Sequence, residues 1–165
     1  MKISILHLED GLHQFQETIN RGSLHFYRDE IYPDDIQVNV DLNKFGKNIT
    51  CSVEISTRAH YICDRCLAEY QKNYIESFSL LFHTGNDRLI TDEANVVILS
   101  PDQKEIDLLP FIQETLILTI PMKQLCRISC KGICPGCGAD LNHEKCTCAE
   151  KPVDPRWEKL IALRK

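Results

Sequence analysis

Hydrophobic and polar residues alternate along two neighbouring segments, residues 36–42 and 49–55. A period of two places the apolar side chains on one face of a β-strand and the polar ones on the other. The apolar positions are Ile36, Val38, Val40, Leu42, Ile49, Cys51, Val53 and Ile55. The sequence NKFGK, residues 43–47, separates the segments and contains the turn-forming Gly46. This pattern predicts a β-hairpin with one face against a core and the other in water.

Two later segments predict further strands. Between Tyr70 and Phe82, the apolar Phe78, Leu80 and Phe82 lie on the opposite face from Ser77 and Ser79. Residues 95–100 (NVVILS) form a short, nearly continuous apolar run. Because sheets with one wet face are typically antiparallel, we expect a mainly antiparallel sheet.

Helical spacing occurs first in residues 10–20 (DGLHQFQETIN). There Leu12, Phe15 and Ile19 recur at intervals of three and four, and Asp10 is a suitable N-cap. This segment is therefore predicted to form a short helix.

The stretch LLPFIQETLILTI, residues 108–120, predicts a second helix. Its apolar positions at helical spacing are Leu108, Leu109, Ile112 and Leu116. Asp107 can cap it, Pro110 is tolerated in the first turn, and Pro121 ends it. We expect this helix to cover the sheet.

The pattern changes after Pro121. From there to Lys165 the alternation stops and six cysteines occur. Only residues 153–165 (VDPRWEKLIALRK) regain helical spacing, with Asp154 as N-cap and Pro155 at the first helical position. The sequence predicts an α+β protein: a scaffold domain, residues 1–120, that carries the CDRC motif, and a cysteine-rich module, residues 121–165, whose terminal helix packs on the scaffold.

No segment predicts export or membrane insertion. Residues 1–11 (MKISILHLEDG) lack the long apolar run and the small-residue cleavage site of a secretory signal. No stretch approaches the roughly eighteen uninterrupted apolar residues of a membrane span. We therefore expect a cytoplasmic protein, in which thiols stay reduced and the nine cysteines act as ligands or reactive groups before they form disulfides.

Eight of the nine cysteines fall into four close pairs. The pairs are Cys63 and Cys66 in CDRC, Cys126 and Cys130 in CRISC, Cys134 and Cys137 in CPGC, and Cys146 and Cys148 in CTC. Zinc prefers four thiolates in a tetrahedron, and cysteines two to four residues apart can place two sulfurs on one ion. The glycines of CPGCG permit a tight turn that leaves backbone N–H groups facing the sulfurs. The sequence therefore predicts structural zinc, with two ions per chain.

The spacing also suggests how the pairs combine. One site would consist of Cys134, Cys137, Cys146 and Cys148, and a second of Cys63, Cys66, Cys126 and Cys130. The second site would tie the module to the sheet. Three residues separate Cys130 from Cys134, so the ligands of the two sites lie within about 14 Å of each other. The alternative is a single site that joins CDRC to CPGC and leaves the other pairs free.

Other interpretations of these residues are weaker. CDRC can act as a thioredoxin-type redox motif, but such a motif opens a helix, whereas the residues after it predict a strand. Cys126 and Cys130 can be spectators, because a CxxxC pair is a loose signature. Cys51 lies on the apolar face of its strand and is expected in the core. His143 is a possible ligand, but it lies in the connector of a site that already has four sulfurs.

Four blocks of the chain resemble a known family. In order they are CDRCLAEY, EIDLLPFIQETLILTIP, CKGICPGCGADLNHEKCTC and DPRWEKLIALRK. They resemble the YceD-like family of bacterial and plastid proteins, the large ribosomal RNA subunit accumulation proteins, and the likeness covers roughly residues 50–165. The resemblance implies a role in accumulation of the large-subunit (23S) ribosomal RNA and in ribosome biogenesis, without an established catalytic activity. It also implies a ribosomal protein as partner, because family genes often lie beside that of a large-subunit protein.

The charge distribution bears on that partner. Residues 1–120 carry 10 Lys and Arg against 19 Asp and Glu, a formal charge of −9, and residues 121–165 carry 9 against 5, or +4. An ion held by four thiolates adds −2, so two sites change the formal charge from −5 to about −9. RNA is then repelled unless cations gather on one face. The candidate cations are Lys123, Arg127, Lys131 and Lys145.

No Ser–His–Asp order or Gly-rich phosphate loop occurs in the sequence, and we expect no enzymatic activity. The favoured function is that of a zinc-stabilised adaptor that binds a ribosomal protein or a pre-ribosomal particle. The alternative is a direct RNA-binding zinc protein. A thiol-disulfide oxidoreductase that uses Cys63 and Cys66 is the least favoured.

Overall fold

The computed structural model describes the chain except for residues 7, 27–29, 86–94 and 149–165. The chain forms two compact units. Met1–Tyr61 and Glu69–Lys123 make up the first, which we call the sheet unit. Ile62–Ala68 and Gln124–Lys165 make up the second, the cysteine unit. The helix predicted for residues 153–165 lies outside the described residues.

The predicted domain division at residue 120 placed the CDRC motif in the scaffold. In the structure the loop Ile62–Ala68 instead groups with the cysteine-rich segment. Backbone hydrogen bonds account for this, because Asp64 N–H donates to the Gln124 carbonyl and Ile133 N–H donates to the Arg65 carbonyl. The loop is therefore part of the cysteine unit, although the strands on both sides of it belong to the sheet.

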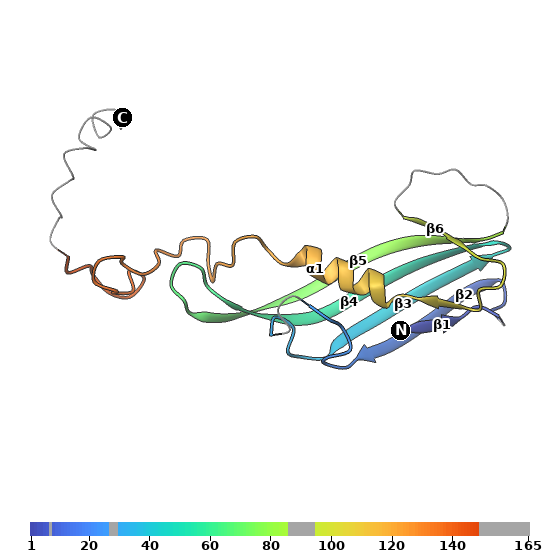
Figure 1. Cartoon of the computed structure of the whole chain (residues 1–165), viewed down its shortest axis with the longest axis horizontal. Coiled ribbons are helices and arrows are strands. Elements are labelled where there is room, and N and C mark those ends of the chain that lie inside the picture. The colour runs from blue at the N-terminus through green and yellow to red at the C-terminus, as the bar shows by residue number, and fades with distance from the viewer. Residues whose placement is uncertain (7, 27–29, 86–94, 149–165) are drawn as a thin grey trace, which may run out of the picture. The chain divides into compact units, whose positions relative to one another are not determined.

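A five-stranded sheet, in the order β2-β3-β4-β5-β6, is the main element of the sheet unit (Figure 1). Its strands are β2 Gly11–Ile19, β3 Ile36–Phe45, β4 Asn48–Ile62, β5 Glu69–Thr84 and β6 Val96–Leu99. β2 and β4 pair antiparallel with β3, whereas β6 runs parallel to β5. The α+β class is confirmed, but the predicted mainly antiparallel sheet contains a parallel pair.

The predicted hairpin is confirmed as β3 and β4. Val40 pairs with Val53 and Leu42 with Cys51, so the apolar positions of the two strands meet on the buried face. Their polar neighbours are exposed. Gly46, at the turn, adopts a φ of 56°, in the left-handed region that a glycine enters without strain. The strict alternation was therefore a reliable signal for these strands.

The helix predicted for residues 10–20 is wrong. Residues Gly11–Ile19 form β2, which pairs antiparallel with β3 along its whole length. Phe15 and Ile19 face the core and are four residues apart, a spacing that fits both a helix turn and two strand periods. Leu12, which completed the helical pattern, is 66% exposed. Pairing with the free edge of β3 outweighed a helical propensity that rested on few residues.

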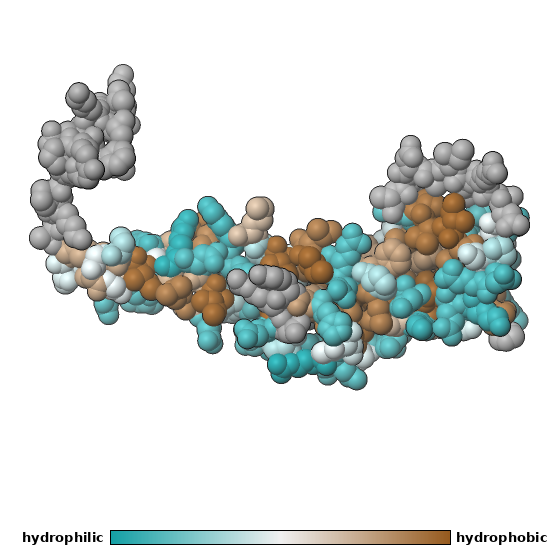
Figure 2. Space-filling view, in the orientation of Figure 1, coloured by the Kyte–Doolittle hydropathy of each residue, from teal (hydrophilic) through white to brown (hydrophobic). Residues whose placement is uncertain are grey.

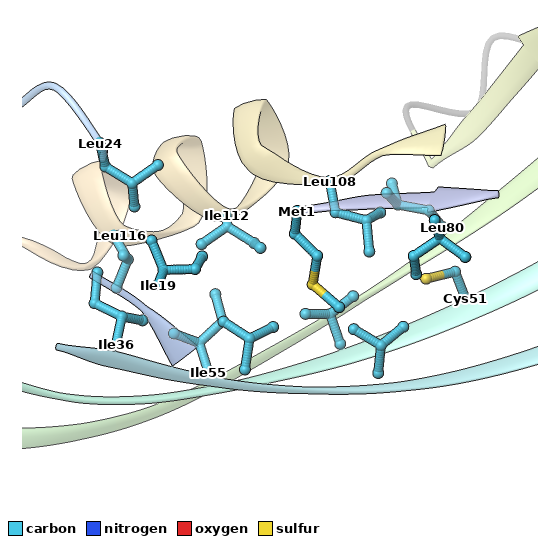
Figure 3. Close-up of a cluster of buried hydrophobic side chains, with 14 of the residues drawn as sticks. Met1, Ile19, Leu24, Ile36, Cys51, Ile55, Leu80, Leu108, Ile112 and Leu116 are labelled. Atoms are coloured by element: carbon cyan, nitrogen blue, oxygen red, sulfur yellow. The ribbon is translucent and has the colours of Figure 1, made fainter. Parts of the chain in front are cut away.

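A second layer covers the inner face of the sheet. It consists of helix α1, Leu109–Thr119, and a two-stranded sheet of β1, Lys2–Ser4, with β7, Glu105–Asp107. Figure 3 shows the side chains of Ile112 and Leu116 of α1 directed toward Ile36 and Ile55 of the sheet. The predicted covering helix is thus confirmed.

The ends of α1 follow the sequence signals in part. The N-cap is Leu108, without a side-chain cap, and not the predicted Asp107. The Asp107 carboxylate still accepts the N–H of Leu109 at 3.1 Å, and Pro110 lies in the first turn. The helix ends at Thr119, two residues before Pro121. Ile117 and Leu118 stay exposed, and hydrophobic surface is visible over this helix in Figure 2. Among the described residues, no helix has the length and apolar character needed to cross a membrane.

Candidate metal centres

Eight cysteines come together in two groups of four. The first group is Cys63, Cys66, Cys126 and Cys130, and the second is Cys134, Cys137, Cys146 and Cys148. Within each group all four sulfur atoms lie within 4.8 Å of one another. These are the two sets that the sequence spacing suggested. The single site joining CDRC to CPGC does not occur.

The sulfur separations fit a tetrahedral metal shell. The Sγ atoms of Cys63 and Cys130 are 3.9 Å apart, and those of Cys66 and Cys126 are 3.7 Å apart. In the second group the separations from Cys146 are 3.3 Å to Cys134 and 3.9 Å to Cys137. Metal–sulfur bonds of about 2.3 Å in a tetrahedron place sulfurs about 3.8 Å apart. Disulfide sulfurs would be about 2.05 Å apart, and all nine cysteines are free thiols.

The motifs CDRC and CPGC fold into the same backbone turn. Cys63 N–H donates to the Ala68 carbonyl, and Cys134 N–H donates in the same way to the Ala139 carbonyl. The Cys63 carbonyl accepts the N–H of Leu67, and the Cys134 carbonyl accepts that of Gly138. These repeated contacts close two zinc-knuckle turns in which both cysteine side chains point to one side.

The residue after each knuckle takes a left-handed conformation. Gly138 has a φ of 77° and Leu67 has a φ of 58°. Glycine adopts this conformation freely, whereas a leucine pays strain for it. Leu67 was not singled out from the sequence, but its position equivalent to the glycine of CPGCG is a signal that could have identified it.

Backbone N–H groups around the sulfurs favour thiolates. The N–H groups of Cys126, Cys66 and Arg65 lower the pKa of the Cys63 thiol to about 6. Those of Ala139 and Thr147 do the same for Cys137, whose pKa is also about 6. Such donors stabilise negative charge on the ligands of a metal ion. Each group therefore contains a thiol that ionises readily at neutral pH.

Not all four thiols of a group can ionise together without a cation. Burial raises the pKa of Cys126 to about 12, and the neighbouring thiol of Cys137 leads the groups that raise the pKa of Cys148 to about 12. A divalent ion would remove this repulsion and displace the protons. The donor set, its separations and its N–H bonds thus fit a tetrahedral ion such as zinc.

The two groups differ in exposure. Cys63 and Cys130 are buried, and Cys66 and Cys126 are half-buried. In the second group only Cys134 is buried. The first group is therefore enclosed by the chain, and the second is open to solvent on the sides of three of its ligands.

Two further residues of interest do not join these groups. Cys51 is fully buried in the core of the sheet unit, as predicted. His143 is exposed, and its Nε2 lies 3.9 Å from the Asp140 carboxylate. Sequence reasoning missed Gly132, Asp140 and Asn142, which surround the link between the groups. The sequence signal that could have identified two of them is an Asn two residues after an Asp in the segment between Cys137 and Cys146.

The cations proposed for RNA contact divide between the units. Arg127, Lys131 and Lys145 are exposed residues of the cysteine unit, whereas Lys123 belongs to the sheet unit. Arg65 is an additional cation of the cysteine unit, and its Nη1 donates to the Cys130 carbonyl at 2.7 Å. The structure thus brings three of the four predicted cations into the unit that holds the sulfurs.

Comparisons with known proteins match this region. The family model described as large ribosomal RNA subunit accumulation protein YceD matches residues 51–164. The large ribosomal RNA subunit accumulation protein YCED homolog 1, chloroplastic, of Arabidopsis thaliana is 29% identical over 161 residues, which cover 81% of this chain and 50% of the relative. An uncharacterized protein of Mycobacterium tuberculosis is 29% identical over 133 residues, 78% of this chain and 61% of the relative.

A homolog 1 of the same name from Zea mays is 41% identical over 51 residues, 30% of this chain and 17% of the relative. The chain thus spans about half the length of the Arabidopsis protein and 61% of the mycobacterial one. No solved structure matches the chain.

Proposed function

The chain belongs to the YceD family of large ribosomal RNA subunit accumulation proteins, and from this premise we propose that it supports accumulation of the large-subunit (23S) ribosomal RNA. The Arabidopsis and maize relatives are named as large ribosomal RNA subunit accumulation proteins. Here the protein acts without catalysis, as an adaptor in large-subunit biogenesis. Its two cysteine groups each hold a structural zinc ion.

The observation that carries the zinc part of the proposal is the absence of a core from the described cysteine unit. Its buried residues are Cys63, Cys130, Gly132 and Cys134, and the hydrophobic core cluster contains no residue of this unit. About thirty residues cannot hold a defined conformation without burying apolar surface or binding a metal. The two groups of four cysteines offer the ligands for such a metal.

Charge supports an adaptor that binds protein. The sheet unit lies almost entirely within residues 1–120, whose formal charge is −9 from 10 Lys and Arg against 19 Asp and Glu. Two thiolate-bound zinc ions add a further −4 in the cysteine unit. Basic ribosomal proteins are attracted by such a field, whereas bare RNA is repelled.

A second candidate function, direct RNA binding, draws support from one observation. Arg127, Lys131 and Lys145 are exposed in the same unit and can contact phosphates. Aromatic side chains for base stacking are lacking in the described part of this unit: neither Ile62–Ala68 nor residues 124–148 contain a Phe, Tyr or Trp. Phosphate contact alone gives weak, salt-sensitive binding.

The experiment that separates these functions uses the full-length, metal-loaded protein. Binding to isolated 23S RNA and to purified large-subunit ribosomal proteins is measured over a salt series. We expect RNA affinity no better than the non-specific range, about 10⁻⁴ to 10⁻⁶ M at physiological salt, and tighter binding to a ribosomal protein. Submicromolar RNA binding that weakens in the triple variant Arg127→Gln, Lys131→Gln, Lys145→Gln would instead establish direct RNA binding as the function.

The cellular role has its own test. Cells that lack the protein should accumulate less 23S than 16S RNA, and the wild-type chain should restore the ratio. Cys134→Ser should fail to restore it, because an incomplete thiolate shell binds zinc weakly. A normal RNA ratio in cells without the protein would exclude the proposed role.

A further inference from the structure

The side chain of Asn142 lies between the two cysteine groups. It belongs to the connector between Cys137 and Cys146, two members of the second group, yet its Nδ2 donates to the Sγ of Cys130 in the first group at 3.5 Å. The same Nδ2 donates to Asp140 Oδ1 at 2.7 Å, and Asn142 Oδ1 accepts the Lys131 N–H at 2.8 Å. These neighbours fix the amide orientation, because a flipped amide would set its oxygen against the Asp140 carboxylate and the sulfur.

The connector that carries Asn142 is held at both ends by the second group. Cys137 precedes it and Cys146 follows it. Within it, Leu141 N–H donates to the Gly132 carbonyl at 2.9 Å, and the Asp140 side chain accepts the Asn142 N–H at 2.9 Å. An ion that fixes Cys137 and Cys146 therefore also fixes the loop from which the Asn142 amide reaches Cys130.

The other side of this contact is held by the first knuckle. Residues 131–133 link Cys130 to Cys134, and Ile133 N–H donates to the Arg65 carbonyl at 2.9 Å. Arg65 Nη1 donates to the Cys130 carbonyl at 2.7 Å. Gly132 has a φ of 79°, and a Cβ there would lie 2.8 Å from the Arg65 carbonyl oxygen. The link is thus too closely packed to let one group move independently of the other.

We propose that Asn142 couples the two metal centres, so that an ion in the second group strengthens the binding of an ion in the first. With the second group loaded, the connector holds the Asn142 N–H on the Cys130 sulfur, and this donor stabilises the thiolate that binds the first ion. Without the second ion the connector is released and the donor is lost. By thermodynamic reciprocity the first ion strengthens binding of the second by the same factor.

This inference rests on the proposed metal sites but not on the ribosomal role. Asn142 is a positioning residue, since it acts through Cys130. Hydrogen-bond partners of metal ligands commonly change metal affinity by about 10- to 100-fold. We expect an effect of that size for the Asn142 donor.

The test is a titration of the reduced, metal-free full-length protein with Co²⁺, followed by its sulfur-to-cobalt charge-transfer absorption, and with Zn²⁺ against a chromophoric chelator. Asn142→Asp keeps an oxygen for the Lys131 N–H and replaces the donor to Cys130 with a carboxylate oxygen. Glu144→Gln is the matched control, because Glu144 is an exposed residue of the same connector, whereas the side chain of His143 lies 3.9 Å from the Asp140 carboxylate that holds Asn142.

We expect wild type and Glu144→Gln to bind two ions cooperatively. Asn142→Asp should still bind two ions, with the first group weakened about 10- to 100-fold and the cooperativity lost. The variant Cys137→Ser, Cys146→Ser isolates the first group. In this variant the affinity of the first group for its ion should already be low. Adding Asn142→Asp should lower that affinity no further, because both changes remove the same interaction and their effects are then not additive in a double-mutant cycle.

The possible failures are distinguishable. A wild-type protein that binds no metal would remove the premise. Two ions bound with affinities that Asn142→Asp leaves unchanged would overturn the coupling and retain the metal sites. Asn142→Ala removes the donor without adding charge, so a loss confined to the aspartate variant would assign the effect to charge and also overturn the proposal.

Discussion

The sheet unit and the cysteine unit are held together by different interactions. Strands β3 and β4, helix α1 and strand β1 bury a continuous cluster of aliphatic and aromatic side chains. Burial of each such side chain contributes about 1.5 to 3 kcal/mol. The described cysteine unit buries three sulfurs and a glycine, and its exposed residues include Ile62, Leu67 and Ile128. In the function proposed above, a structural zinc ion in each cysteine group, with a binding free energy of about 10 to 16 kcal/mol in small domains, would replace the missing core.

This difference determines how each unit responds to damage. In the sheet unit the stabilising contacts are spread over many residues, so one substitution removes a small part of them. In the cysteine unit the proposed stabilisation is concentrated at eight sulfur atoms, four in each group. We therefore expect a change at one sulfur to disrupt the group to which it belongs and to leave the sheet unit folded.

The largest effect we predict is that of metal removal. Chelation of the metal-loaded protein should abolish hydrogen-exchange protection in residues 130–141 and leave β3 and β4 protected, because only the cysteine unit couples folding to metal binding. Cys134→Ser should abolish protection around the second group, in residues 134–141, and leave the first group able to bind its ion. Cys51→Ser is the matched control: Cys51 is fully buried in the sheet core, so the variant should keep both ions while the sheet loses about 1 to 3 kcal/mol to a buried hydroxyl.

Retained protection of residues 130–141 after complete chelation would show that the cysteine unit folds without metal. Loss of metal from Cys51→Ser would show that the two units do not respond separately. Either result would show that the sheet unit and the cysteine unit are not stabilised in the different ways described above.

The next effect concerns the sheet unit alone. Leu116→Ala should lower its free energy of unfolding by about 2 to 5 kcal/mol, because Leu116 is 0% exposed and its removal leaves a cavity under α1. Leu118→Ala on the same helix should cost less than about 0.5 kcal/mol, because Leu118 is 77% exposed. Denaturant unfolding checks both variants, and zinc stoichiometry should be unchanged in each. Equal costs for the two variants would contradict the placement of α1 on the sheet.

The two units also differ in how far the sequence predicts them. Strict alternation over several residue pairs predicted β3 and β4, and helical spacing ended by Pro121 predicted α1. The helix prediction for residues 10–20 failed because a spacing of four between Phe15 and Ile19 fits a helix and a strand equally well. Only the neighbouring strand decides between these, and pairing with β3 is not encoded in the local period. The parallel placement of β6 was likewise unpredictable from a four-residue strand.

In the cysteine unit the spacing alone suggested both groups of four sulfurs, because a knuckle places its two thiols without reference to distant residues. The parts that remained hidden depend on tertiary contact. Gly132 is required by the approach of the Arg65 carbonyl, and Asn142 matters because its amide reaches Cys130. Neither relation has a periodic signature. The grouping of Ile62–Ala68 with a segment sixty residues later is of the same kind.

A smaller effect is expected at two glycines with the same backbone conformation. Gly132 and Gly138 have φ values of 79° and 77°, so alanine is strained at both by about 1 to 2 kcal/mol. At Gly132 the new Cβ would also lie 2.8 Å from the Arg65 carbonyl oxygen, whereas at Gly138 nothing lies within 4 Å. Gly132→Ala should therefore weaken metal binding more than Gly138→Ala, as measured by zinc competition. Equal losses would show that the knuckle and the link are not in close contact.

Alkaline pH should weaken the sheet unit through Cys51. Burial raises the pKa of this thiol from 9.0 to about 11, so the folded unit favours the protonated form more than the unfolded chain does. Its contribution is complete below pH 9 and is lost as the pH rises through about 11, a change of about 1 to 3 kcal/mol. Unfolding free energies measured at pH 8 to 11 should fall more steeply for wild type than for Cys51→Ala. Parallel curves would show that Cys51 ionises without opening the core.

The smallest effect tests whether the two knuckles are equivalent. Leu67 occupies the left-handed position that Gly138 occupies in the other knuckle, so its backbone is strained. Its side chain is 65% exposed, and within the described chain no packing contact offsets this strain. Leu67→Gly should relieve about 1 to 2 kcal/mol of strain. The added freedom of glycine in the unfolded chain costs about 0.5 to 1 kcal/mol, which leaves a net gain of about 0 to 1.5 kcal/mol, centred at about 0.75 kcal/mol. The central value corresponds to about a two- to fivefold higher zinc affinity at the first group, measured by chelator competition against Gly138→Leu, which should lose affinity. A lower affinity for Leu67→Gly would mean that the leucine side chain, and not the turn alone, stabilises the first knuckle.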